Sequence, residues 1–206
     1  TCFVTTIGLV QFFSGQFQKV YKPNRYFIAA GFGPLGWDLP AAIGVKVARP
    51  EATVVDVVGD FGFGYMENQL AVASMYSIPI IVTIIDDGCL GLIRQNQELA
   101  YGFHYGVDIV YDRLAPRLTD FVKLAEAYGI AGERVEVPDD IRPAFERAMK
   151  ANEEGRPYLI DFITESVDAS TGLRIDKIVE RGYRVSPVPP AKVDIEIPPV
   201  SRFPQK

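Results

Sequence analysis

Two apolar runs of strand length most constrain how this chain can fold. Residues 53–58 (TVVDVV) and 78–85 (IPIIVTII) are apolar almost throughout, not at alternate positions, which is typical of strands covered on both faces. Other apolar runs predict strands at 26–30, 131–137 and 158–163, and helical patterns begin near Asp38 and span 62–77, 118–128 and 139–153. A loop is expected after residue 85. This alternation predicts an α/β fold, a doubly wound parallel sheet with helices on both faces.

Acidic residues follow both runs. The first run leads into Gly59-Asp60-Phe61 and the second into Asp86-Asp87-Gly88. Parallel strands end at one edge of a sheet, where open α/β sheets bind ligands, so Asp60 and Asp87 are expected to converge there. Two carboxylates repel each other unless a cation lies between them, and Mg²⁺ prefers oxygen ligands and substrate phosphates. The first amides of the helix at 62–77 would face that phosphate. Either acid alone would more often be a turn or a helix cap.

Composition bounds the other possibilities. With 206 residues, 48% of them hydrophobic, we expect one domain over residues 1–182 and an extended proline-rich tail over 183–206. The net charge of -5 argues against nucleic-acid binding. The two cysteines, Cys2 and Cys89, are far apart, which favours a reducing compartment and excludes a disulfide scaffold. With no leader or membrane span recognised, a cytoplasmic location is expected.

Several familiar motifs are excluded by their context. Residues 31–36 (GFGPLG) match the dinucleotide-binding pattern, but that site needs an acid at the end of the next strand. Asp56 instead lies inside its strand, with two valines beyond it. The triplet Asp60-Phe61-Gly62 matches a kinase metal motif, but the other kinase motifs are missing. No Walker phosphate-binding loop is present either.

Taken together, these residues resemble the C-terminal cofactor-binding domain of thiamine-diphosphate-dependent enzymes. That family pattern is Gly-Asp-Gly, a spacer of roughly 25 residues and Asn-Asn. The spacing fits, although Phe61 replaces the last glycine and Asp86-Asp87 replaces the two asparagines. The resemblance covers residues 1 to about 165 and is closest to glyoxylate carboligases, then to acetolactate synthases. The segments that carry it are 5–9, 20–22, 33–37, 39–42 and 90–95. Leu35 and Asn96 favour the carboligases, because acetolactate synthases usually have Met and Trp there.

The resemblance also implies a set of site residues. Mg²⁺ would be bound by the side chains of Asp60 and Asp87 and by the backbone carbonyl of Cys89. The implied cofactor-binding residues are Gly33, Leu35, Gly59, Asp60, Phe61, Gly62 and Asp87. The Gly33 carbonyl would accept from the aminopyrimidine, Leu35 would bend the cofactor, and the amides of Phe61 and Gly62 would meet the diphosphate. Leu90 and Ile93 would either line the substrate side or pack the loop. No catalytic side chain is predicted from this chain.

The implied activity is decarboxylating carboligation of small 2-oxo acids. Two glyoxylates would give tartronate semialdehyde and CO₂, or pyruvate would give acetolactate. In this family a pyrimidine-side domain, usually from a neighbouring subunit, supplies a glutamate, and a middle domain can hold FAD. Both domains are absent from the sequence, so the chain would be a fragment or one subunit of a homo- or hetero-oligomer. A non-catalytic structural subunit with a decayed cofactor site is the alternative of another class.

Three further residues allow two interpretations each. His104 is the only histidine, and its aromatic and glycine neighbours favour loop packing over proton transfer. Trp37 would either wall the cofactor pocket or belong to the core. Arg94 would pair either with a substrate carboxylate or with an acidic side chain of the protein.

Overall fold

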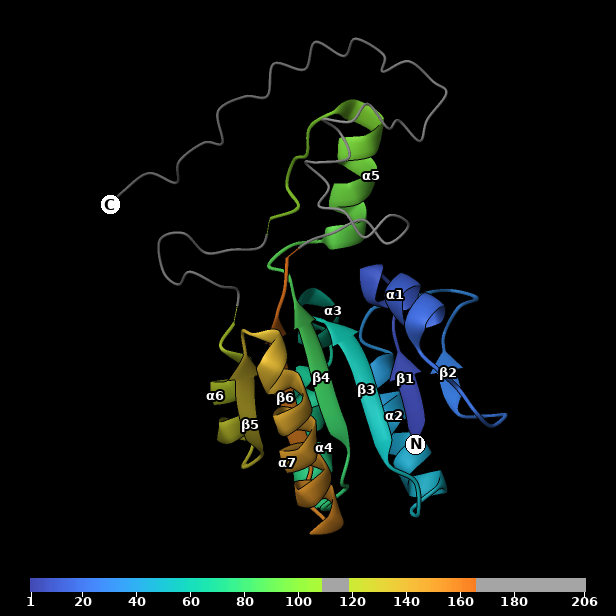
Figure 1. Cartoon of the computed structure of the whole chain (residues 1–206), viewed down its shortest axis with the longest axis vertical. Helices are drawn as coiled ribbons and strands as arrows, with labels where there is room; N and C mark the ends of the chain where they lie inside the picture. Colours follow the sequence, from blue (N-terminus) through green and yellow to red (C-terminus); the bar gives the residue numbers. More distant parts are fainter. Residues whose placement is uncertain (109–118, 166–206) are drawn as a thin grey trace.

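The computed structural model of the protein describes residues 1–108 and 119–165. In this part of the chain the strands form one sheet in the order β2-β1-β3-β4-β6-β5, and every neighbouring pair is parallel (Figure 1). The strands are β1 (Cys2–Thr5), β2 (Tyr26–Ile28), β3 (Val54–Gly59), β4 (Ile81–Asp86), β5 (Ala131–Val135) and β6 (Tyr158–Ile163). The chain places β2 on one side of β1 and β3 on the other side, so the direction of strand addition reverses between β1 and β3. The predicted α/β class with a parallel sheet is confirmed.

Helices connect the strands. The α-helices are α1 (Leu9–Phe17), α2 (Asp38–Ala48), α3 (Asp60–Gly64), α4 (Leu70–Met75), α5 (Gly91–Tyr101), α6 (Phe121–Ala127) and α7 (Ile141–Glu153), and two 3₁₀ turns, η1 (Glu67–Gln69) and η2 (Pro138–Asp140), precede α4 and α7. Helix α7 lies in front of the sheet in Figure 1, whereas α2, α4 and α6 lie behind it. None of the helices in the described ranges has both the length and the apolar character that a membrane crossing requires.

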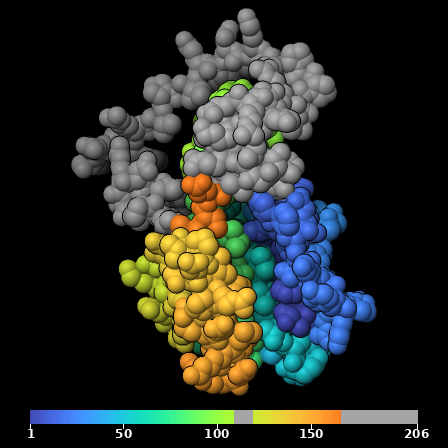
Figure 2. All heavy atoms as spheres, in the orientation of Figure 1, coloured from blue at the N-terminus to red at the C-terminus, as the bar shows by residue number. Residues whose placement is uncertain are grey.

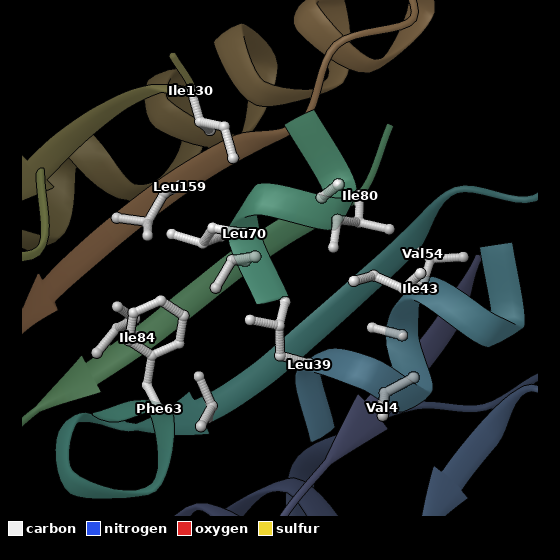
Figure 3. Packing of buried hydrophobic residues seen from close by; sticks show 14 of the residues in the cluster. Val4, Leu39, Ile43, Val54, Phe63, Leu70, Ile80, Ile84, Ile130 and Leu159 are labelled. Carbon is white, nitrogen blue, oxygen red and sulfur yellow. The ribbon is translucent and has the colours of Figure 1, made fainter. Parts of the chain in front are cut away.

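The sheet buries apolar side chains on both faces. On one face, Val54, Val58 and Ile84 pack with residues of α2, α4 and α6, as in the cluster around Leu39 and Leu70 (Figure 3). On the other face, a smaller cluster joins the alternate strand residues to α7; its buried members are Val55, Ile81, Val135, Ala144, Ala148, Ile160 and Phe162. This double coverage explains why the strand sequences are apolar throughout.

The pairing of β3 with β4 sets the level of the acidic residues. Gly59 lies opposite Ile85 in the parallel register, so Asp60 and the pair Asp86-Asp87 emerge at the same edge of the sheet. Helix α5 stands beyond this edge in Figure 1, next to the end of β4. The predicted convergence of the two strand ends is therefore confirmed.

Several predicted bounds are wrong. The expected helix over 62–77 is interrupted at residues 65–66, because the chain there packs against Gly36, where an added Cβ would lie 2.7 Å from Met66 Cγ. Strand β4 begins at Ile81 rather than at residue 78, since Pro79 has no amide to donate to a neighbouring strand. Strands β2 and β5 end two residues early. The predicted domain boundary at 182/183 and the tail lie outside the described residues.

The sequence patterns did not predict β1, α1 or α5. Strand β1 has only four residues and α1 only nine, so each gives a weak periodic signal. The expected loop after residue 85 is in fact a short connection followed by α5. Much of α5 is polar, and its placement depends on contacts with distant segments, which sequence periodicity does not reveal.

Candidate functional site

A cavity of about 520 Å³ opens at the edge where β3 and β4 end. In Figure 2 the N-terminal residues, in blue, and the residues from α7 to β6, in yellow to orange, lie on either side of the central strands near this edge. The cavity is lined by Ile7, Gly8, Leu9, Val10, Phe13, Ser14, Phe17, Gln18, Leu35, Val57, Gly59, Asp60, Phe61, Gly62, Ile85, Asp87, Cys89, Leu90, Gly91, Leu92, Ile93, Thr164 and Glu165. Its walls are mostly apolar, and its acidic residues lie at the strand ends.

Every candidate site residue except Gly33 lines this cavity. Leu35 comes from the loop before α2, and Asp60 and its neighbours come from the β3–α3 junction. Cys89 and Leu90 immediately precede α5, and Ile93 lies in its first turn. Gly33 is set back from the lining. It adopts a left-handed conformation with φ of 64°, and an added Cβ would lie 3.1 Å from Cδ1 of Ile7, which does line the cavity.

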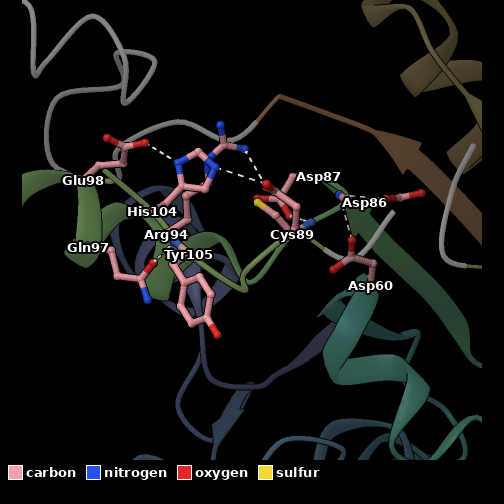
Figure 4. A network of polar contacts seen from close by, with 11 residues as sticks. Asp60, Asp86, Asp87, Cys89, Arg94, Gln97, Glu98, His104 and Tyr105 are labelled. Carbon is pink, nitrogen blue, oxygen red and sulfur yellow. Dashed lines mark hydrogen bonds and ion pairs between the residues drawn. The ribbon is translucent and has the colours of Figure 1, made fainter. Parts of the chain in front are cut away.

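Asp60 is held at the base of the site by backbone amides. Its side chain is buried, and its Oδ2 accepts a hydrogen bond from the Gly88 amide at 2.9 Å (Figure 4). The same amide also donates to Asp86 Oδ1 at 3.1 Å. The Phe61 amide donates to Asp60 Oδ1 at 2.6 Å. The loop after β4 and the start of α3 therefore meet at the Asp60 carboxyl group.

The electrostatics at this point favour a cation. Burial raises the pKa of Asp60 to about 8, the negative charge of Asp87 adds to the rise, and the Phe61 amide opposes it. Asp60 thus retains its proton near neutral pH unless a positive charge compensates its carboxylate. Carboxylate and carbonyl oxygens are the ligands that Mg²⁺ prefers, so the donor types here fit that ion. Among residues 1–108 and 119–165, no ready-made metal cluster of three or more His, Cys, Asp or Glu residues occurs.

Asp87 is fixed by the start of α5. Its Oδ1 accepts a hydrogen bond from the Cys89 amide at 3.3 Å. A Cβ added to Gly91 would lie 2.5 Å from Asp87 Oδ2 and 2.6 Å from Leu9 Cδ1. A side chain at this position would require the ends of the Asp87 and Leu9 side chains to shift. Gly91 is therefore a site-shaping residue that the sequence reasoning missed.

The three residues with open interpretations lie outside the cavity lining. Trp37 is half-buried and packs against the main core cluster, as the second interpretation predicted. Arg94 pairs with Asp108, with 3.4 Å between Nη1 and Oδ1. His104 contacts Glu98 and Asp108. Arg94 and His104 thus belong to one polar group that connects α5 with the segment after it.

Sequence reasoning also missed the contribution of α1. Val10, Phe13, Ser14 and Phe17 line one wall of the cavity. A signal was present in the sequence, because Gly8 follows the short apolar run of β1 and precedes α1, the same strand-glycine-helix order that marks Gly59. The structure gives Gly8 a φ of 112°, which favours glycine.

Several known proteins are similar to this chain in sequence. The family model described as the C-terminal TPP binding domain of thiamine pyrophosphate enzymes matches residues 6–162. A glyoxylate carboligase of Escherichia coli O157:H7 is 38% identical over 186 residues, covering 87% of this chain and 31% of that relative. A probable acetolactate synthase large subunit of Methanocaldococcus jannaschii is 37% identical over 191 residues, covering 91% of this chain and 31% of that relative.

A solved structure shares the fold. The thiamine diphosphate-dependent 4-hydroxybenzoylformate decarboxylase of Rhodococcus jostii RHA1 is 30% identical and matches with a TM-score of 0.68, covering 81% of this chain and 30% of that one. The chain therefore spans about a third of the length of these relatives.

Proposed function

The chain belongs to the thiamine pyrophosphate enzymes, whose C-terminal TPP binding domain it matches over residues 6–162, and we propose that it binds thiamine diphosphate and Mg²⁺ as part of a carboligase. The proposal depends most on one observation: Asp60 and Asp87 follow neighbouring parallel strands and line the same cavity. This is the crevice at which open α/β sheets take ligands. The cavity is also large enough for a cofactor, at about 520 Å³.

In this proposal the metal is held by the carboxylates of Asp60 and Asp87 and by the backbone carbonyl of Cys89. The raised pKa of Asp60, caused by burial and then by Asp87, supports it, since a divalent cation would compensate both carboxylates. The Phe61 amide currently donates to Asp60. For this amide to meet a diphosphate, together with that of Gly62, the hydrogen bond to Asp60 would have to be exchanged.

The remaining residues orient and shield the cofactor. Leu35 and Gly62 are close neighbours, because a Cβ on Gly62 would lie 3.5 Å from Leu35 Cδ2. Leu35 would therefore contact a cofactor held by the Gly62 amide. The Gly33 carbonyl would accept from its pyrimidine end. Leu90 and Ile93 would exclude water on the substrate side. When bound, thiamine diphosphate would supply the electron sink that decarboxylation of a 2-oxo acid needs.

For the substrate, we propose glyoxylate, with two molecules giving tartronate semialdehyde and CO₂. The similarity to a glyoxylate carboligase supports this choice, as do Leu35 and Asn96. The alternative is acetolactate synthesis from pyruvate, which the nearly equal similarity to a probable acetolactate synthase large subunit favours. A carboligase of the first kind should release CO₂ from glyoxylate and largely ignore pyruvate.

The proposed enzyme is larger than this chain. Since the chain spans about a third of its relatives, we propose that a pyrimidine-side domain completes the site, from the same polypeptide or from another subunit of a homo- or hetero-oligomer. A further domain could hold FAD. The described chain alone is then expected to bind cofactor weakly and to show no turnover.

The proposal is tested by native mass spectrometry of the complete assembly, purified with thiamine diphosphate and Mg²⁺. Bound cofactor is expected in the wild type, and its Mg²⁺-dependent binding should be lost in Asp60→Ala. Asp139→Ala, which removes an exposed acid before α7, is the matched control and should bind as the wild type does. An intact assembly that takes up no cofactor would instead indicate a structural subunit with a decayed site, and unchanged binding by Asp60→Ala would refute the metal assignment.

A further inference from the structure

The segment that follows α5 returns to the beginning of that helix. Residues 89 and 108 form an isolated antiparallel bridge, and the Leu90 amide donates to the Val107 carbonyl at 2.8 Å. Val107 is buried, so this contact is protected from water. The returning residues 107–108 therefore hold the chain at the point where it passes from β4 into α5.

This hydrogen bond also sets the direction of the Cys89 carbonyl. The Leu90 amide and the Cys89 carbonyl belong to one planar peptide unit and point in opposite directions. When the amide is directed toward Val107, the carbonyl is directed away from it. The carbonyl proposed as a metal ligand thus has its orientation decided by a segment that does not line the cavity.

A polar group of four side chains holds the returning segment against α5 (Figure 4). We name it the His104 cluster; its members are Arg94, Glu98, His104 and Asp108. His104 Nδ1 contacts Glu98 Oε1, and Nε2 lies 3.1 Å from Asp108 Oδ2. Arg94 Nη1 lies 3.4 Å from the other oxygen of Asp108. The ring of His104 therefore links the last turns of α5 to Asp108, the bridge partner of Cys89.

The contact between His104 and Glu98 is partly shielded from water. The side chains of His104 and Glu98 are 26% and 15% exposed, so water screens their interaction only partly. A protonated imidazole donates at both nitrogens, and here each nitrogen faces a carboxylate. The Tyr105 amide adds a hydrogen bond to Gln97 Oε1 at 2.8 Å, which ties the same loop to α5 once more.

From these contacts we propose that His104 is a positioning residue for the metal site: by holding Asp108 against α5, it fixes the Cys89–Leu90 peptide that presents the Cys89 carbonyl. The inference rests on the proposed function for the role of that carbonyl. The protection of the Leu90 amide from hydrogen exchange, however, can be measured without any ligand. None of the four side chains of the His104 cluster lines the cavity, so the effect passes through the backbone.

The test compares His104→Ala and His104→Gln with the wild type in the complete assembly. Two quantities are measured: the hydrogen-exchange rate of the Leu90 amide without ligand, and the Mg²⁺ concentration that half-saturates binding of thiamine diphosphate. His104→Ala should raise the exchange rate about tenfold and the Mg²⁺ requirement about three- to tenfold. Glutamine keeps one donor and should recover part of both effects.

The matched control is Arg147→Ala, which removes an ion pair with Glu133 that joins α7 to β5. It should lower thermal stability without changing either quantity. Equal shifts in Arg147→Ala and His104→Ala would overturn the inference, as would a wild-type exchange rate at Leu90 in His104→Ala. If the wild type shows no Mg²⁺-dependent cofactor binding, the proposed function fails, and the Leu90 exchange rate still decides whether His104 holds this segment.

Discussion

Asp87 departs from the pattern that the family resemblance predicts. It stands where the resemblance expects asparagine, and it adds a negative charge next to the buried Asp60, whose pKa it helps to raise. A carboxylate and an amide both offer an oxygen ligand, but only the carboxylate strengthens metal binding through its charge. The same charge repels a diphosphate. The residue therefore acts in opposite directions on the two proposed ligands.

We predict that Asp87→Asn separates these two effects. The Mg²⁺ concentration for half-saturation should rise, whereas the affinity for thiamine diphosphate at saturating Mg²⁺ should increase. Each change should be about three- to tenfold, since one charge at short range in a partly hydrated site contributes about 1 kcal/mol. Calorimetric titrations of metal and cofactor measure both constants, with Asp139→Asn as the control. Two shifts in the same direction would contradict the prediction.

At the scale of secondary-structure elements, the start of α5 depends on Gly91, a residue without a side chain. Helix α5 approaches Leu9 and Asp87 so closely that any Cβ at Gly91 would collide with both. Glycine normally weakens a helix relative to alanine by about 1 kcal/mol. At this position the absence of a side chain lets α5 pack closely against Leu9 and Asp87.

We predict that Gly91→Ala lowers both stability and Mg²⁺-dependent cofactor affinity, because Leu9 or the Asp87 carboxylate must move. Gly44→Ala is a matched control, since Gly44 lies inside α2 and an added Cβ there meets nothing within 4 Å. It should raise stability by about 0.5–1 kcal/mol. Thermal unfolding and cofactor titration measure both variants. A gain of stability in Gly91→Ala like that in Gly44→Ala would refute the packing argument.

At the scale of the whole molecule, the core contains a pair of acids. Asp56 lies in the middle of β3 and Asp38 in the first turn of α2, and both are fully buried. Among the described residues, neither carboxyl oxygen of Asp56 has a hydrogen-bond partner. Burial, and then the charge of Asp38, raises the pKa of Asp56 well above its usual value. Burial likewise raises the pKa of Asp38 to about 6.

We predict that this pair makes stability fall as pH rises. Above about pH 4 the unfolded chain releases these protons, while the native state keeps them up to the raised pKa values, so the native state binds more protons and the free energy of unfolding decreases with pH. Asp56→Asn carries no charge at any pH. Its stability relative to the wild type should therefore increase by about 1.4 kcal/mol per pH unit between pH 4 and 6.

Urea unfolding at pH 4.5 and 6 measures this difference, and Asp139→Asn controls for the loss of one exposed negative charge. A difference between Asp56→Asn and wild type that is equal at both pH values would show that the native state does not retain the proton.

The sequence by itself determined the fold class and the family, and it predicted many of the residues that line the cavity. Apolar runs over 53–58 and 78–85 identified β3 and β4 because strands covered on both faces need apolar residues throughout. The acids after them, Asp60 and Asp87, then had to meet, since parallel strands end at one edge. The family resemblance is confirmed by the match over residues 6–162. The roles of the individual site residues and the choice of substrate stay predictions.

Only the tertiary structure decided how the walls of the site are built. Three features depend on contacts between segments far apart in the chain. They are the cavity wall formed by α1, the break in the helix predicted at 62–77, and the position of α5. Gly91 is an example: its neighbour Leu9 begins α1 and is brought next to it by the packing of α5. Periodicity reports which face of an element is buried. It does not report which distant segment covers that face, because that depends on the shapes of both.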